Sequence, residues 1–113
     1  MKVLKINPNR PEKRLLKLAS DVLKSDGLIV YPTDTLYGLG VNALSSKAVN
    51  KVYRVKGRDF KKPLSIAFYS VEHAKKYVEF NPLALKLAKK FLPGPLTIVL
   101  PMKHKFPKKL TYG

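Results

Sequence analysis

The apolar positions of the chain follow two spacings, and these spacings predict its secondary structure. We expect helices where apolar residues recur every three or four positions, and strands where short apolar runs stand between turn residues. The expected helices begin near Glu12, Ser45 or Ser46, Val71 and Asn81, and the third of them is short and covers residues 71–78. The expected strands cover residues 3–6, 28–31, 64–68 and 96–100. The resulting order, β-α-β-α-β-α-α-β, predicts an α/β domain with an open mixed sheet flanked by helices.

Turn and capping residues mark the ends of several of these elements. Ser25-Asp26-Gly27 ends the first helix, Pro93-Gly94-Pro95 breaks the last one, and a serine can cap the second. The run Leu28-Ile29-Val30-Tyr31 is apolar throughout, so we expect it to be a buried strand that could pair in parallel. A polar, glycine-rich turn from Pro32 to Gly40 follows it.

The length of 113 residues suits a single domain that covers residues 1–113. A four-stranded sheet in so short a chain leaves an edge or a face uncovered, and no closing element is expected after Pro101. We therefore expect the domain to be truncated and to lack its C-terminal part, or to complete its sheet by self-association. The alternative is that the last residues simply lie on the surface.

The charge of the chain is strongly positive and unevenly distributed. Its formal value is +16, from 23 Lys and Arg against 7 Asp and Glu, and no acidic residue follows Glu79. Because such an excess repels itself, we expect an anionic partner, such as tRNA or double-stranded RNA, or a phosphate-bearing small molecule. The alternative is that the lysines cover solvated faces, as in many Lys-rich proteins from hot environments.

Composition excludes several classes of site. The absence of cysteine excludes a disulfide scaffold, a thiolate metal site and a cysteine nucleophile, while His73 and His104 lack metal-ligand spacing and are expected on the surface. No Ser-His-Asp pattern or carboxylate pair is recognisable, so no nucleophile or general base is predicted. Apolar runs fall short of the roughly 20 residues that span a bilayer, and no signal peptide is recognisable. We expect a cytoplasmic protein without a membrane partner.

The first candidate site is the segment Tyr31–Gly40, which follows the expected strand 28–31. Ligands of open α/β sheets collect beyond the carboxyl ends of strands, and threonine hydroxyls such as that of Thr35 could hydrogen-bond a carboxylate or amide. The glycines could let a ligand approach the backbone. The segment lacks the Gly-Lys-Ser/Thr of a Walker loop, and Ala43 stands where a dinucleotide fingerprint has its third glycine. A strand-to-helix turn without a ligand is the alternative.

The second candidate site is the basic segment from Arg54 to Pro63. Arg58 offers a planar fork for bidentate phosphate binding, and Lys56 adds a movable point charge. Gly57 lets the backbone turn so that both side chains can converge, which matters because a single exposed cation binds phosphate weakly. A solvated basic loop is the alternative.

Three blocks of the sequence together resemble the YrdC family, whose best-known members are threonylcarbamoyl-adenylate synthases. The blocks are Pro32-Thr33-Asp34-Thr35-Leu36-Tyr37-Gly38-Leu39-Gly40, then Lys56-Gly57-Arg58 with Lys62-Pro63-Leu64, and finally Pro93-Gly94-Pro95-Leu96-Thr97. They keep the order and spacing of the family from about Leu15 to the end of the chain. The resemblance implies a YrdC-like fold, a twisted open mixed sheet flanked by helices.

The resemblance also implies a nucleotidyltransferase that joins L-threonine, bicarbonate or carbon dioxide, and ATP into threonylcarbamoyl-AMP and pyrophosphate. Other proteins then transfer the activated group to tRNA, which yields threonylcarbamoyladenosine. By similarity, Thr35 would hold threonine, Lys56 and Arg58 would hold the nucleotide phosphates, and Lys62 falls at a further nucleotide contact that is often Asn. Mg²⁺ is expected on the triphosphate.

Some features of the family are missing from this chain. The family carries a Ser/Ala-x-Asn signature in its C-terminal half, and some relatives have a threonine-contacting histidine where this chain has Ala67. We therefore expect these 113 residues to be an incomplete catalytic unit that could be inactive alone. Two other interpretations stay open: a non-catalytic RNA-binding module of the same fold, and a folding fragment without activity.

Overall fold

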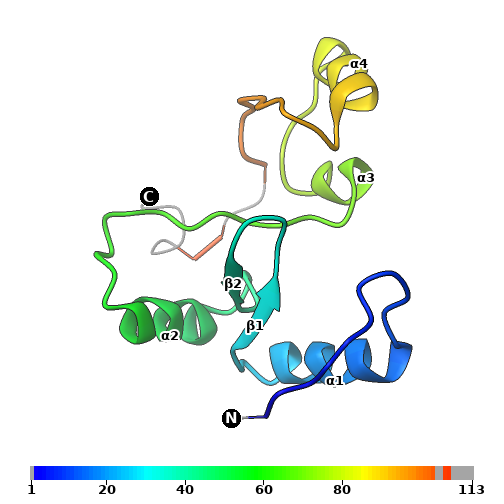
Figure 1. The fold of residues 1–113 in the computed structure, drawn as a ribbon. Coiled ribbons are helices and arrows are strands. Elements are labelled where there is room, and N and C mark those ends of the chain that lie inside the picture. Colours follow the sequence, from blue (N-terminus) through cyan, green and yellow to red (C-terminus); the bar gives the residue numbers. More distant parts are fainter. Residues whose placement is uncertain (1, 104–105, 108–113) are drawn as a thin grey trace. The chain divides into compact units, whose positions relative to one another are not determined.

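A computed structural model describes residues 2–103 and 106–107 of the chain (Figure 1). The described residues form two compact units, the first made of residues 2–64 and 107 and the second of residues 65–103 and 106. Each unit is described by itself below. His104 lies outside the described residues, so its predicted surface position stays a prediction.

The first unit contains helices α1 (Lys13–Lys24) and α2 (Ser46–Lys56) and strands β1 (Ile29–Pro32) and β2 (Tyr37–Gly40) (Figure 1). Both helices were predicted from their apolar spacing. The core of this unit consists of Leu15 from α1 and four residues of one face of α2, namely Ala48, Val49, Val52 and Tyr53. Amphipathic spacing thus places a continuous apolar face of α2 inside the unit.

Strands β1 and β2 form an antiparallel hairpin in which Val30 pairs with Leu39 and Tyr31 pairs with Gly38. The predicted buried, parallel-capable strand at residues 28–31 was therefore wrong in pairing and in burial, because Val30 is 63% exposed. The predicted turn over residues 32–40 was too long, since its second half is β2. The short connection between the strands explains the difference: it can join only antiparallel neighbours.

The second unit contains α3 (Val71–Ala74) and α4 (Pro82–Phe91). Each begins at a side-chain cap: Ser70 Oγ accepts the His73 N–H at 3.0 Å, and Asn81 Oδ1 accepts the Ala84 N–H at 2.8 Å. The helix predicted over residues 71–78 is shorter than expected. The helix ends at Ala74, and residues 75–78 are not helical. Here the Lys103 N–H donates to the Tyr77 carbonyl at 2.7 Å, next to an isolated β-bridge between residues 78 and 102.

Three predicted strands, at residues 3–6, 64–68 and 96–100, are not strands in the described part of the chain. Side chains nevertheless alternate between half-buried and exposed along residues 64–70 and 96–100, which is the period of an extended chain. These segments lack the ladder of backbone hydrogen bonds that defines a strand. The α/β class is confirmed, while the sheet of the described residues has two antiparallel strands instead of four in a mixed arrangement.

None of the helices within the described ranges has the length and apolar character that crossing a bilayer requires.

Candidate functional site

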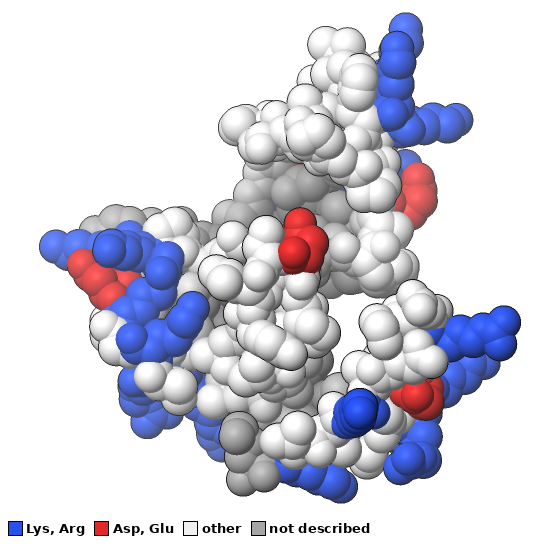
Figure 2. Space-filling view, in the orientation of Figure 1, with Lys and Arg blue, Asp and Glu red and all other residues white. Residues whose placement is uncertain are grey.

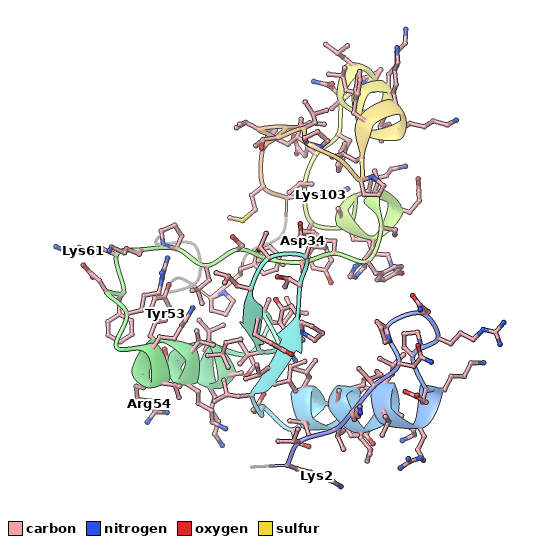
Figure 3. All side chains as sticks on the ribbon, in the orientation of Figure 1. Lys2, Asp34, Tyr53, Arg54, Lys61 and Lys103 are labelled. Atoms are coloured by element: carbon pink, nitrogen blue, oxygen red, sulfur yellow. The ribbon has the colours of Figure 1, made fainter. Side chains whose placement is uncertain are left out.

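The predicted threonine contact, Thr35, lies in the turn that joins β1 to β2. Thr33 closes this turn: its N–H donates to the Leu36 carbonyl at 3.1 Å, and its Oγ1 accepts the Leu36 N–H at 3.1 Å and the Thr35 N–H at 3.4 Å. The Thr33 hydroxyl also donates to the Leu36 carbonyl. Figure 3 shows Asp34 at the tip of the hairpin. Thr35 is exposed, so its hydroxyl is accessible for a small polar ligand in this unit.

The glycines of the hairpin lie beneath the ring of Tyr31. A Cβ atom added to Gly38 would stand 2.6 Å from Tyr31 Cζ, and one added to Gly40 would stand 2.9 Å from Tyr31 Cε1. Real Cβ atoms do not approach other atoms so closely, so glycine is required at both positions. The sequence had suggested that these glycines let a ligand approach the backbone. On this face of the hairpin the Tyr31 ring occupies that space instead.

The second predicted block begins where α2 ends. Gly57 has a φ of 59°, in the left-handed region, and the Arg58 N–H donates back to the Tyr53 carbonyl at 3.0 Å. A Cβ at Gly57 would meet nothing within 4 Å, so space does not require glycine here. Glycine is favoured because it adopts the positive φ angle at low cost. Lys56 therefore stands at the end of the helix, and Arg58 stands just after the reversal.

Residues 57–63 form an ordered connection that we call the basic loop. Asp59 organises it from within, because its carboxylate accepts the Lys61 N–H at 2.9 Å and its carbonyl accepts the Lys62 N–H at 3.0 Å. The Tyr53 hydroxyl donates to the Lys62 carbonyl at 2.8 Å, and the Phe60 ring lies 5.0 Å from the Tyr53 ring. Figure 3 shows Tyr53 on the loop side of α2 and Arg54 on the opposite side.

Arg58 is the half-buried cation of the basic loop. Its Nη2 donates to the Pro63 carbonyl at 3.2 Å, which holds the guanidinium against its own loop. Its Nε is buried and has no hydrogen-bond partner within the described residues. A guanidinium carries five N–H donors, and a buried donor without an acceptor costs free energy. The Pro63 carbonyl uses one donor of the guanidinium, so the group keeps its positive charge and further donors for an anion.

The cations of this loop are not neutralised by carboxylates within the described part of the chain. The ion pairs there are Lys17–Asp21 at 3.1 Å and Lys75–Glu72 at 3.4 Å, and neither includes a residue of the basic loop. Lys56 and Lys62 are exposed, so their ammonium groups are accessible to a ligand. Residues 56–63 contain four Lys or Arg residues and one acidic residue, Asp59, so the segment has a net positive charge.

The structure thus brings Lys56, Arg58 and Lys62 onto one helix end and one loop. Thr35 lies on a different loop of the same compact unit, and among the described residues no hydrogen bond joins it to those three. A hollow shared by Thr35 and Arg58 stays a prediction. The sequence did not reveal the roles of Thr33 and Tyr53. The role of Asp59 could have been found, because an Asp followed two residues later by a free backbone N–H, here that of Lys61, is typical of an Asx turn.

His73 is half-buried, contrary to the expected surface position. Its ring stacks on Tyr69 with centroids 4.3 Å apart, and it also contacts Phe68 and Tyr77 edge-on. Three aromatic residues around this short helix create the environment of His73, and the isolated position of the histidine in the sequence did not reveal it. No group of three or more His, Cys, Asp or Glu side chains able to hold a metal exists among the described residues.

Comparisons with known sequences identify a family and several named relatives. The family model Sua5/YciO/YrdC, described as telomere recombination, matches residues 21–113. A protein of Methanocaldococcus jannaschii is 44% identical over 107 residues, which cover 95% of this chain and 51% of that protein. The threonylcarbamoyl-AMP synthase of Pyrococcus abyssi is 39% identical over 105 residues, which cover 92% of this chain and 31% of the synthase. The chain therefore spans about half the length of one relative and about a third of the other.

Solved structures match the fold as well. Sua5 of P. abyssi, crystallised with L-threonine, gives a TM-score of 0.79 at 39% identity, over 90% of this chain and 30% of that one. YciO of E. coli gives a TM-score of 0.77 at 27% identity, over 93% of this chain and 51% of that one. Sequence and fold agree, and the chain belongs to the Sua5/YciO/YrdC family.

Proposed function

We propose that this chain carries the threonine-binding and phosphate-binding part of a threonylcarbamoyl-AMP synthase. The proposal is supported by similarity to proteins of that name from P. abyssi and from Bacillus subtilis, the latter 37% identical over 86 residues. These matches cover 31% and 25% of the two relatives, so the proposal concerns one part of such an enzyme.

The observation that carries the proposal is the geometry of Arg58. Its Nη2 donates to the Pro63 carbonyl, which orients the guanidinium and uses only one of its five N–H donors. Because the loop is anchored before any ligand arrives, little ordering is needed to bind one. A triphosphate supplies several charged acceptor oxygens, and Lys56 and Lys62 offset further charge.

Thr35 is proposed to hold the amino acid. The P. abyssi structure contains L-threonine, and Thr35 of this chain presents an exposed hydroxyl on a turn whose backbone is fixed by Thr33. A hydroxyl both donates and accepts, so it suits the carboxylate or the carbamate of a bound threonine.

The proposed reaction needs no covalent enzyme intermediate. The threonine amine attacks carbon dioxide and loses a proton to water, which gives a carbamate. A carbamate oxygen then attacks the α-phosphorus of ATP, and the bond to the β-phosphate breaks to release pyrophosphate. Positioning and charge stabilisation supply most of the acceleration in such a step. Mg²⁺ would enter with ATP, bound mainly by phosphate oxygens and water.

Calorimetry on the 113-residue chain tests the proposal. We expect Mg-ATP and L-threonine to bind in the millimolar range or tighter, and Arg58→Ala to weaken ATP about tenfold or more, because a hydrogen bond to a charged group is worth about 1.5–3 kcal/mol. Lys61→Ala is the matched control: it removes an exposed charge from the same loop and should change ATP binding only slightly. Absence of ATP and threonine binding at millimolar concentration would refute the proposal for this chain.

RNA binding is a second candidate function, favoured by the charge. Figure 2 shows Lys and Arg over α1 and α2, whereas the hairpin between them contains one charged residue, Asp34. A tRNA or a double-stranded RNA in the cytoplasm would be the partner, consistent with a role in tRNA processing. Binding that weakens steeply with salt and is indifferent to threonine and to Arg58→Ala would favour this function over the synthase.

Self-association stays a further proposal. The β1–β2 sheet has two strands, and large apolar side chains of the hairpin are exposed, with Leu36 at 78% and Tyr37 at 77%. Strand edges of this kind pair readily with a second copy. Sedimentation across a range of protein concentrations would detect a dimer, and a monomer at every concentration would exclude it.

A further inference from the structure

We propose that Thr33 is a positioning residue for the amino-acid site: its hydroxyl closes the hairpin turn and thereby fixes the direction of Thr35. The inference rests on the proposed function, in which Thr35 binds threonine. Thr33 Oγ1 accepts the N–H groups of both Thr35 and Leu36, and its hydroxyl donates to the Leu36 carbonyl. One side chain therefore engages both turn residues that follow Asp34.

The other contacts of the hairpin do little to fix this turn, so the Thr33 side chain is needed for it. The last rung of the ladder pairs Pro32 with Tyr37. Because the next pair, Thr33 and Leu36, is hydrogen-bonded, the alternation of an antiparallel ladder makes Pro32–Tyr37 a pair without backbone hydrogen bonds. Apolar packing contributes little, because Leu36 is 78% exposed. The N–H and hydroxyl of Thr33 therefore close the turn beyond this rung.

The base of the hairpin is fixed separately. The Tyr31 ring lies on Gly38 and Gly40, across the rung that pairs Tyr31 with Gly38. With the base held by this packing and the turn held by Thr33, Thr35 is presented in one orientation before a ligand binds. Preorganisation of this kind raises affinity because less conformational freedom is lost on binding.

Loss of the Thr33 hydroxyl should lower the affinity for threonine and not the affinity for ATP. Among the described residues, Thr33 makes no hydrogen bond to the basic loop. Its substitution should therefore weaken threonine binding and leave binding of the nucleotide phosphates unchanged. Thr33→Val keeps the shape of the side chain and removes its donor and acceptor, whereas Thr33→Ser keeps both.

Titration calorimetry and amide hydrogen exchange on the 113-residue chain test the inference. We expect Thr33→Val to weaken threonine about fivefold to tenfold and to speed exchange of the Leu36 amide, with ATP affinity and melting temperature nearly unchanged. Thr33→Ser should restore threonine affinity to within about twofold of the wild type. Thr35→Ala serves as the reference for loss of the direct contact.

The outcomes separate the two proposals. A wild-type chain that binds no threonine refutes the proposed function. Threonine binding by Thr33→Val at wild-type strength overturns the present inference and leaves the function standing. The inference is equally overturned if the Leu36 amide is unprotected in the wild type, if Thr33→Ser fails to rescue, or if Thr33→Val weakens ATP as much as threonine, since the residue would then be only structural.

Discussion

The Tyr53 hydroxyl donates a hydrogen bond to the Lys62 carbonyl oxygen at 2.8 Å, and this contact joins the core of the first unit to the basic loop. Tyr53 is 1% exposed, so the donor is held in place by the packing of α2. The Tyr53 carbonyl also accepts the Arg58 N–H at 3.0 Å. A single buried residue thus fixes both ends of the loop that carries the proposed phosphate contacts.

Tyr53→Phe should loosen the basic loop without disturbing the core. The substitution removes the hydroxyl and keeps the ring, so we expect a loss of about 0.5–1.5 kcal/mol in the free energy of unfolding. ATP affinity should fall a few-fold, because Arg58 would be less well ordered. Urea unfolding and calorimetry measure the two effects. Tyr69→Phe, at a residue that is 83% exposed in the other unit, is the control and should change neither quantity. Unaltered ATP affinity in Tyr53→Phe would contradict the role given to the loop.

Arg58→Lys should bind ATP poorly although it preserves the charge. A lysine cannot donate to the Pro63 carbonyl and to a phosphate through one rigid fork, so we expect at least about a tenfold loss of affinity. Arg54→Lys is the matched control, since Arg54 is exposed and lies on the opposite side of α2 (Figure 3). Nucleotide binding measured by calorimetry should be normal in that control. Equal affinity of Arg58→Lys and the wild type would show that only the charge matters.

Gly38→Ala should destabilise the hairpin by displacing the Tyr31 ring. The new Cβ would overlap the ring, and overpacking typically costs about 1–3 kcal/mol. Chemical denaturation measures this loss. Tyr31→Ala should relieve it, so the double variant Tyr31→Ala with Gly38→Ala is expected to be more stable than the sum of the single effects predicts. Strict additivity of the two substitutions would show that the ring and the glycine do not interact.

The helices were predictable from sequence because their determinants are local. The apolar spacing of α1, α2 and α4 and the N-terminal caps of α2 and α4 lie within or beside each segment, and the structure reproduces them. A strand forms only by pairing with another segment, and the residues of the strand itself do not determine which segment that is. Residues 64–70 and 96–100 therefore keep the alternating exposure that their sequence implies without a ladder.

The residue types of the candidate site were predictable, but their supports were not. Lys56, Gly57 and Arg58 stood out because a glycine between two cations has a clear physical reading. The supports act across the fold or through exact turn geometry: Tyr53 reads as one more apolar position of a helix, and nothing in its spacing reveals that its hydroxyl reaches Lys62. The Tyr31 packing on Gly38 likewise depends on the antiparallel register.

Ser45→Ala should destabilise α2, whereas the neighbouring Ser46→Ala should not. The sequence left either serine as the cap, and the structure assigns the role to Ser45, whose Oγ accepts the Ala48 N–H at 3.2 Å. Loss of such a cap costs about 1 kcal/mol, while Ser46 lies inside the helix, where alanine is slightly favoured over serine. Urea denaturation of both variants measures the difference. Because α2 supplies most of the core of the first unit, Ser45→Ala should also increase fraying at the start of that helix, seen as faster exchange of the Ala48 amide. Equal stability of the two variants would mean that this capping bond contributes nothing in solution.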